Sequence, residues 1–204
     1  MSQIVEFFFS PGSRYSYLAA SRVPELEREF DCTIVWRPVH GPDIRALRGR
    51  DPLIGPPPSG QYEWTYREAD AGAWADFYGI PFHEPRTHDF DSRLLVRAAS
   101  ASCELDRVAE YSWELSSEVY GRRAWPIDEA LCLRVARATG LDSPRFRELL
   151  RSSLIEQAVE ASAREALERG AFGVPTFFVN AQMFWGNDHL PLVRHALGNA
   201  SSNA

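Results

Sequence analysis

The sequence predicts an α/β protein in which a βαβ unit and a ββα unit are separated by a large all-helical block. Two apolar runs, at 3–9 and 33–38, enclose a helical pattern, which is typical of a parallel βαβ unit. Residues from about 60 to 168 show helical periodicity and no strand pattern. Two short apolar runs, 176–180 and 182–185, then precede a last helical segment, as in a β-hairpin followed by a helix.

The predicted βαβ unit begins with Gln3 to Phe9, a nearly continuous apolar run that indicates a strand buried on both faces. Ser10-Pro11-Gly12 ends this strand, and a helical pattern then runs from Arg14 to about Phe30. Thr33 to Pro38 is predicted as the second strand. Ser13 is placed as the N-cap of the helix, where a hydroxyl lies among free N–H groups and an anion such as a thiolate is stabilised.

The rest of the chain is predicted to be mainly helical. Glycine and proline recur throughout 40–59, which predicts a long loop, either a lid or binding loop or a plain connector. Gly140 and the Ser143-Pro144 pair mark the end of one helix and the start of the next. The predicted helices after this loop are 62–78, 92–103, 107–120, 128–139, 143–168 and 189–197.

This order of elements is that of a thioredoxin-like fold split by a helical domain. We therefore predict two domains. Residues 1–59 and 169–204 form the split thioredoxin-like domain, and residues 60–168 form the helical insertion domain.

Composition and charge exclude several classes of function. The formal net charge is −6, and all 22 basic residues are arginine, so no lysine can serve as a Schiff base or a general base. The acidic balance and the lack of a basic run argue against nucleic acid as a partner. Cys32, Cys103 and Cys132 form no CxxC pair, which argues against a metal site and dithiol chemistry and fits a reducing compartment. We find no secretory signal and no membrane span, so we expect a cytoplasmic protein.

Three stretches carry a resemblance to a known family. They are Ser-Arg-Tyr-Ser-Tyr-Leu at 13–18, Phe-Gly-Val-Pro-Thr at 172–176 and Phe-Trp-Gly-Asn-Asp-His-Leu at 184–190. In this order they resemble the 2-hydroxychromene-2-carboxylate isomerase family, whose relatives are the kappa-class glutathione transferases. Both groups belong to the DsbA-like branch of the thioredoxin superfamily. The resemblance covers nearly the whole chain and implies a DsbA-type fold with a large all-helical insertion.

The resemblance implies roles for several residues. Ser13 matches the catalytic serine, which replaces the attacking cysteine of thiol oxidoreductases. Pro175 matches a cis-proline that faces the active site, and the backbone of Val174 would pair with bound glutathione. Asn187 and Asp188 match the positions that receive the γ-glutamyl end of glutathione. From the residues alone, Pro175 could instead simply start an edge strand, and Asp188 could cap the last helix.

The sequence also departs from the family pattern. Ser10 stands where the family commonly has aspartate, Arg14 replaces a proline, and Arg50 replaces an asparagine that helps to hold glutathione. We keep Arg50 as a glutathione-binding candidate, because Arg14 and Arg50 can each offer a guanidinium fork to a carboxylate. Arg14, Tyr17 and Trp185 are the substrate-binding candidates, although Trp185 can also be read as a core residue.

The implied function is that of a glutathione-dependent cis–trans isomerase acting on an aromatic hydroxy acid or a pyruvate-type substrate. Glutathione, or another low-molecular-weight thiol, would be the cofactor, and a homodimer is implied. Ser13 would stabilise the thiolate, so it needs no His/Asp triad, and we recognise none among the five histidines. Two alternatives remain open: a kappa-like thiol transferase, and a redox-inactive thioredoxin-like module that binds partners along the Val174-Pro175 edge.

Overall fold

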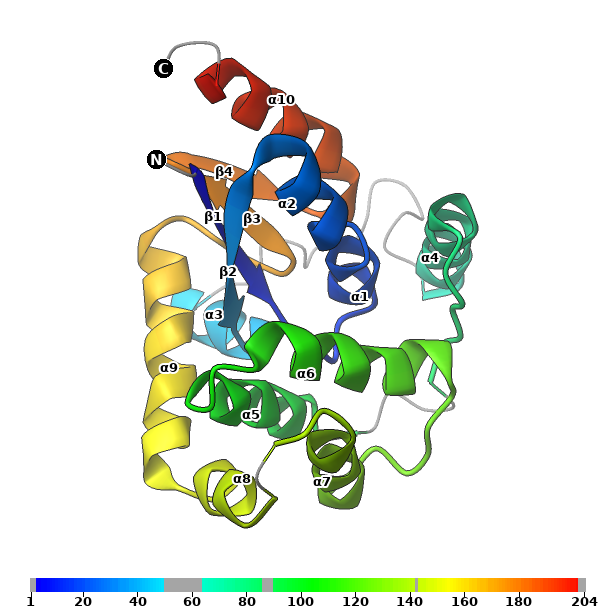
Figure 1. Cartoon of the computed structure of the whole chain (residues 1–204), viewed down its shortest axis with the longest axis vertical. Helices are drawn as coiled ribbons and strands as arrows, with labels where there is room; N and C mark the ends of the chain where they lie inside the picture. The colour runs from blue at the N-terminus through cyan, green and yellow to red at the C-terminus, as the bar shows by residue number, and fades with distance from the viewer. Residues whose placement is uncertain (1–2, 50–63, 86–89, 142, 202–204) are drawn as a thin grey trace.

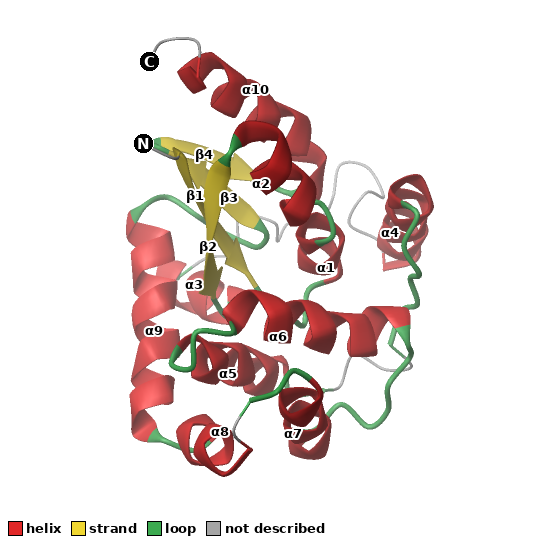
Figure 2. Ribbon diagram, in the orientation of Figure 1, coloured by secondary structure: helices red, strands yellow, loops and turns green. Residues whose placement is uncertain are grey.

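The computed structural model of this chain describes residues 3–49, 64–85, 90–141 and 143–201. Its strands gather in the upper half of the view in Figure 1, while the lower half is built from helices. Figure 2 shows this separation of strand and helix by colour. The arrangement is that of a mixed α/β thioredoxin-like fold, with a helical insertion between the second strand and the third.

Among the described residues the sheet has four strands, in the spatial order β2 (Cys32–Pro38), β1 (Gln3–Phe9), β3 (Thr176–Val179) and β4 (Gln182–Trp185). β1 pairs in parallel with β2, as the predicted βαβ unit requires. β3 runs antiparallel to β1, and β4 closes a hairpin with β3. The carboxyl ends of β1 and β2 therefore lie at the same edge of the sheet as the start of β3.

The side chains of β1 alternate between two cores, because successive residues of a strand point to opposite faces. Phe7 and Phe9 lie on the face covered by α1 (Arg14–Ala20), α2 (Val23–Phe30) and α10 (Leu190–Ser201), where Phe7 stacks on Phe177 with ring centroids 4.6 Å apart. Phe8 faces the other core, which also contains residues of α3 (Gly41–Arg48) and α9 (Ser153–Glu168). The predicted burial on both faces is confirmed for Phe7 to Phe9, whereas Ile4 at the start of the strand is 59% exposed.

The helical insertion has a core of its own, built around Tyr111, Leu115 and Phe146. The helix α9 runs from this region to the sheet and packs against both α3 and α5 (Ser92–Cys103) (Figure 1). Every helix in the described ranges is too short or too polar to span a lipid bilayer. Besides α9, the insertion contains α4 (Trp64–Tyr78), α5 (Ser92–Cys103), α6 (Val108–Ser116), the π-helical turn η2 (Ser117–Gly121), α7 (Glu129–Ala138) and α8 (Ser143–Leu150).

The loop predicted for 40–59 is wrong over its first part, where residues 41–48 form α3. Pro42 lies in the first turn of α3, where a backbone N–H has no acceptor within the helix, so the proline costs no hydrogen bond. Gly49, with φ 73°, then ends the helix in the left-handed conformation that glycine favours. The rest of this predicted loop, from residue 50 to 59, lies outside the described residues.

Two helices that the sequence predicts as continuous are each divided. The predicted helix from Arg14 to Phe30 breaks after α1, and Pro24 then lies in the first turn of α2. The predicted helix 143–168 breaks between α8 and α9, where the Ser152 side chain accepts a hydrogen bond from the Ile155 N–H and caps α9. The sequence contains a helix-start signal at both breaks, Pro24 and Ser152. The apolar residues keep their helical spacing across each break, which is why a continuous helix is predicted.

Candidate active site

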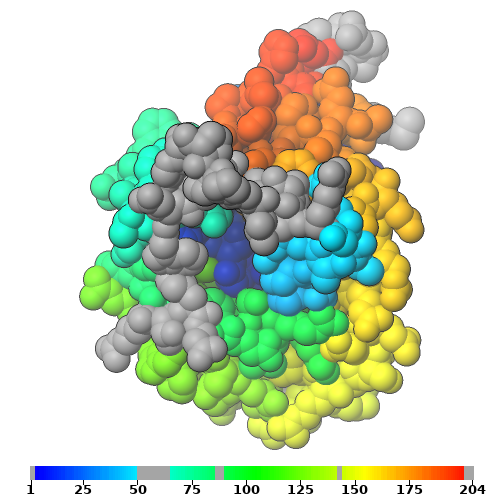
Figure 3. Space-filling model, turned by 180° about the vertical axis from the view of Figure 1, so that it is seen from behind, coloured from blue at the N-terminus to red at the C-terminus, as the bar shows by residue number. Residues whose placement is uncertain are grey.

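Three segments that are far apart in the sequence meet at one edge of the sheet. Residues 10–13 follow β1, residues 39–42 follow β2, and residues 172–175 precede β3. They surround a cleft with a volume of about 370 Å³. Seen from behind in Figure 3, blue atoms of the N-terminal segment lie in a hollow between the cyan atoms of α3 and the green atoms of the insertion.

Ser13 lines this cleft and is the N-cap of α1, as the sequence predicts. Its backbone is extended (φ −110°, ψ 120°), and its Oγ accepts a hydrogen bond from the Ser16 N–H at 3.3 Å. Among the described residues, no group accepts the proton of the Ser13 hydroxyl. Ser13 therefore presents a half-buried O–H to the cleft while its oxygen holds the start of the helix.

The peptide bond between Val174 and Pro175 is cis, and Val174 lines the same cleft as Ser13. Neighbouring backbone groups are already occupied: the Thr176 hydroxyl donates to the Gly173 carbonyl at 2.8 Å, and the Gly186 N–H donates to the Pro175 carbonyl at 2.9 Å. Within the described ranges, neither the N–H nor the carbonyl of Val174 makes a hydrogen bond. A bound peptide-like ligand can therefore pair with both.

The lining of the cleft is cationic and aromatic, although the whole chain is acidic. Among the described residues that line it, three are arginines, Arg14, Arg45 and Arg67, and one, Glu84, carries a carboxylate. A site with this balance favours anionic ligands. Aromatic rings supply flat apolar surface beside these charges, and they come from Tyr15, Phe90, Tyr120, Phe172 and Trp185.

Arg14 forms a buried ion pair with Glu84, with 2.9 Å between the guanidinium nitrogen and the carboxylate oxygen. Both side chains are less than a tenth exposed. Burial lowers the pKa of Arg14, and it raises the pKa of Glu84 by more than the neighbouring Arg14 charge lowers it. The predicted substrate contact Arg14 therefore lies in the cleft wall, and Glu84 already holds its guanidinium group.

Trp185 also lines the cleft, packed against Phe172 with ring centroids 4.8 Å apart. Its Nε1 is buried and has no hydrogen-bond partner among the described residues. The close approach of this indole requires Gly173, because a Cβ at that position would lie 2.9 Å from Trp185 Nε1. Trp185 is thus both packed into the hairpin and part of the cleft wall.

The structure does not bring Tyr17 to the cleft. Tyr17 is 1% exposed, stacks between Trp113 and Tyr120, and donates its hydroxyl hydrogen bond to the Pro81 carbonyl at 2.8 Å. Its ring lies behind Tyr120, which does line the cleft. Tyr17 is therefore a core residue, which packs α1 against the helical insertion.

Asn187 and Asp188 lie in a 3-10 turn, η3 (Asn187–His189), which packs against α1 but does not line the cleft. Asn187 is 2% exposed, and its Nδ2 has no partner among the described residues. Asp188 is exposed and lies 3.4 Å from His189. Their assignment to the γ-glutamyl end of glutathione stays a prediction, and Arg50 lies outside the described residues.

The structure also shows a Ser–His–Asp arrangement that the sequence reading did not recognise. Ser92 Oγ lies 3.0 Å from His40 Nε2, and His40 Nδ1 lies 2.8 Å from Asp43 Oδ1. Ser92 lines the cleft, and His40 directly follows the edge of the sheet. Topology is the signal that could have indicated His40, since residues after the carboxyl ends of parallel strands gather at one edge. Ser92 comes from the insertion, whose packing the sequence does not specify.

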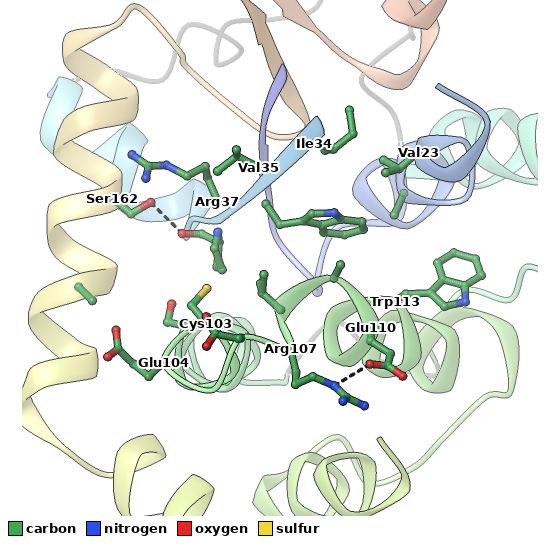
Figure 4. Close-up of a pocket in the computed structure, with 18 of the residues that line it drawn as sticks. Val23, Ile34, Val35, Arg37, Cys103, Glu104, Arg107, Glu110, Trp113 and Ser162 are labelled. Carbon is green, nitrogen blue, oxygen red and sulfur yellow. Dashed lines mark hydrogen bonds and ion pairs between the residues drawn. The ribbon is translucent and has the colours of Figure 1, made fainter. Parts of the chain in front are cut away.

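A larger cavity, of about 1080 Å³, lies between β2, α2 and the helices α5, α6 and α9. Figure 4 shows Val23, Ile34 and Arg37 above it and Cys103 and Trp113 below it. Burial raises the pKa of the Cys103 thiol to about 12, so Cys103 is a poor source of thiolate. None of the predicted site residues lines this cavity. The candidate chemistry is therefore at the smaller cleft.

Comparison with known proteins gives consistent results. Residues 4–198 match the family described as DSBA-like thioredoxin domain. The chain is 30% identical over 196 residues to a 2-hydroxychromene-2-carboxylate isomerase of Pseudomonas putida, covering 96% of this chain and 94% of that protein. An isomerase of the same name from Pseudomonas sp. (strain C18) is 28% identical over 201 residues, and the match covers 98% of this chain and 92% of that protein. A solved structure of a 2-hydroxychromene-2-carboxylate isomerase superposes with a TM-score of 0.86 at 28% identity, covering 98% of this chain and 97% of that one.

Proposed function

The chain belongs to the DSBA-like thioredoxin domain family, with 2-hydroxychromene-2-carboxylate isomerases among its relatives, and from this premise we propose that it is a glutathione-dependent cis–trans isomerase of that type. One observation carries the proposal. Ser13 and Val174, whose backbone N–H and carbonyl make no hydrogen bond within the described residues, lie on the wall of one cleft, although they are separated by most of the chain.

The cleft has features that fit glutathione. The N–H and carbonyl of Val174, which no other described residue pairs with, match the peptide backbone of an extended tripeptide, and the arginine-rich lining matches its two carboxylates. When bound, glutathione would supply a thiolate nucleophile that lets a conjugated double bond rotate. The Ser13 hydroxyl, whose proton is not committed elsewhere among the described residues, would donate to the sulfur and favour its charged form.

The same lining supports an aromatic carboxylic acid as the substrate. Phe90, Phe172 and Trp185 provide flat apolar surface, and Arg45 and Arg67 provide positive charge for a carboxylate. The Tyr15 hydroxyl donates to Asp70 at 2.9 Å, and burial raises its pKa to about 12, so Tyr15 stays neutral and does not oppose an anion. The substrate class in the proposal is therefore a 2-hydroxychromene-2-carboxylate or a benzylidenepyruvate-like acid.

The test follows turnover and thiol content together in one reaction. The purified protein is given 2-hydroxychromene-2-carboxylate with and without glutathione, and the free thiol is titrated before and after complete conversion. We expect conversion that requires glutathione and leaves the thiol concentration unchanged. Loss of one thiol per product would instead indicate a transferase. Conversion that proceeds equally well without glutathione would contradict the proposal.

A further inference from the structure

Two hydrogen bonds in series link Ser92, His40 and Asp43. The chemistry of the three side chains decides which atom donates and which accepts in each bond. A carboxylate only accepts hydrogen bonds, so His40 Nδ1 carries the hydrogen directed at Asp43 Oδ1, 2.8 Å away. In a neutral imidazole, His40 Nε2 is then the acceptor, and the Ser92 hydroxyl donates to it over 3.0 Å. This order, hydroxyl to imidazole to carboxylate, is the one that activates a serine as a nucleophile.

The surroundings fix this geometry. Arg93 forms ion pairs with Asp43 and with Glu156 of α9, which hold the Asp43 carboxylate in place. His40 is 8% exposed, so its imidazole is largely shielded from water. The arginine, the histidine and the aspartate therefore form one continuous network between α3, α5 and α9.

The Ser92 hydroxyl has access to ligands from the cleft. Ser92 lines the cleft, and it packs so closely on Gly12 that a Cβ there would lie 3.2 Å from the Ser92 Cβ. Ser92 is also the first residue of α5, a twelve-residue helix whose first N–H groups have no acceptor within the helix. Asp91 caps the helix by accepting from the Leu94 N–H at 3.0 Å, and the backbone N–H of Arg93, next in sequence to Ser92, is the candidate donor to an oxyanion.

We propose that Ser92 is a second reactive serine of this protein, which hydrolyses small ester or thioester substrates that carry a carboxylate. Ser92 Oγ forms a bond to the acyl carbon, its proton passes to His40 Nε2, and the alcohol or thiol leaves with that proton. Water then attacks the acyl group on Ser92, gives its proton to His40, and the carboxylic acid is released as the serine recovers the proton. The arginines that line the cleft select for an acyl group with negative charge.

This activity is independent of the proposed isomerisation, because it uses neither glutathione nor Ser13. The competing explanation is that the hydrogen-bonded chain merely ties α3 to α5. If the hydrogen bonds only connect the two helices, substitutions that remove them would lower the free energy of unfolding. Such a structural role would not make Ser92 react with an acyl donor.

The experiment treats the full-length protein, without glutathione, with the 4-nitrophenyl ester of succinic acid and with 4-nitrophenyl acetate. Nitrophenolate release gives the rate, and peptide mass spectrometry locates the acyl group. We expect acylation at Ser92, faster with the succinyl ester. The S92A variant should show no labelled peptide, and H40N and D43N should react at least about 100-fold more slowly than the wild type.

Matched controls separate chemistry from folding. S153A replaces the first residue of α9, the counterpart of Ser92 in α5, and H195N replaces an exposed histidine of α10. Both should react at the wild-type rate. If H40N fails to fold by circular dichroism, D43N and S92A decide the question. Acyl groups found only on other residues, or equal rates in the wild type, S92A and D43N, would overturn the proposal.

Discussion

At the scale of single residues, the Ser13 hydroxyl combines two functions in one group. Its oxygen accepts a hydrogen bond from the Ser16 N–H, which caps α1, and its proton is directed at no acceptor among the described residues. Serine is the smallest side chain that can do both. A threonine would add a methyl group in the cleft, and a cysteine would add a reactive thiol that competes with a bound one.

Replacing Ser13 by alanine is expected to lower the glutathione-dependent turnover number by about 100-fold or more, the usual cost of removing one donor to a developing charge. The lost cap should also lower the free energy of unfolding by about 1 kcal/mol. Steady-state kinetics and urea unfolding measure the two effects.

The chain contains a matched control for this variant. Ser152 caps α9 through the same hydrogen bond, at the same 3.3 Å, far from the cleft. S152A should lose a similar free energy of unfolding and keep full turnover. Equal turnover in S13A and S152A would show that Ser13 acts only as a cap.

At the scale of elements, the hairpin of β3 and β4 forms one wall of the cleft because of the glycine that precedes it. A Cβ at residue 173 would lie 2.9 Å from Trp185 Nε1, so any larger residue there would have to push the indole away. G173A is expected to lower the free energy of unfolding by about 1–3 kcal/mol, the usual cost of overpacking, and to raise the KM for glutathione.

Gly72 in α4 provides the comparison for G173A. A Cβ there would meet no atom within 4 Å, so G72A should leave KM unchanged and raise the free energy of unfolding by up to about 1 kcal/mol. An unchanged KM and an unchanged stability in G173A would show that Trp185 is not held in the cleft wall by this contact.

An ion pair between Glu6 and Arg169 links β1 to the end of α9, and its contribution to the free energy of unfolding depends on pH. Glu6 lies 2.5 Å from Arg169 and 3.9 Å from Arg37, and these arginines, chiefly through the Arg169 hydrogen bond, lower the pKa of Glu6 from 4.5. A carboxylate whose pKa is lower in the folded state stabilises that state above its unfolded pKa, and this contribution is lost as the pH falls through the folded value.

At pH 7 the free energy of unfolding of the E6Q variant is therefore expected to be about 0.5–1 kcal/mol lower than that of the wild type. The difference is small because solvent partly screens the ion pair. The difference should shrink as the pH drops below 4.5, the unfolded value. Urea unfolding over a pH series measures it, with E110Q, which alters an exposed ion pair, as the control. A difference that grows in acid would contradict the assignment.

The sequence predicts strands and isolated helices well, and it fails where packing decides. The bounds of β1 and of α5 follow from apolar pattern and turn residues alone. The sequence does not predict the helix α3, because Gly41 and Pro42 are typical of a loop, although both are compatible with a first helical turn. Arg45 of α3 was missed with it, and Arg67 and Ser92 reach the cleft only through the way the insertion packs.

At the scale of the whole molecule, the cleft depends on both parts of the chain. Ser13 and Val174 come from the thioredoxin-like part, whereas Arg67, Ser92 and Tyr120 come from the helical insertion. The thioredoxin-like fold brings its segments to one edge of the sheet, but it does not by itself define an activity. The insertion closes that edge and supplies part of the aromatic surface, from Phe90 and Tyr120, and part of the charge.

The most direct test of the account is the pKa of the thiol of glutathione when it is bound to the protein. Ultraviolet absorbance of the thiolate, followed over a pH titration of the complex, measures it in the wild type and in S13A. We expect a bound thiol that ionises at least about one pH unit below the value of about 8.5 for a free thiol, and a return toward that value in S13A. The same pKa in both proteins, or no binding of glutathione by the wild type, would contradict the central claim that Ser13 stabilises a thiolate in this cleft.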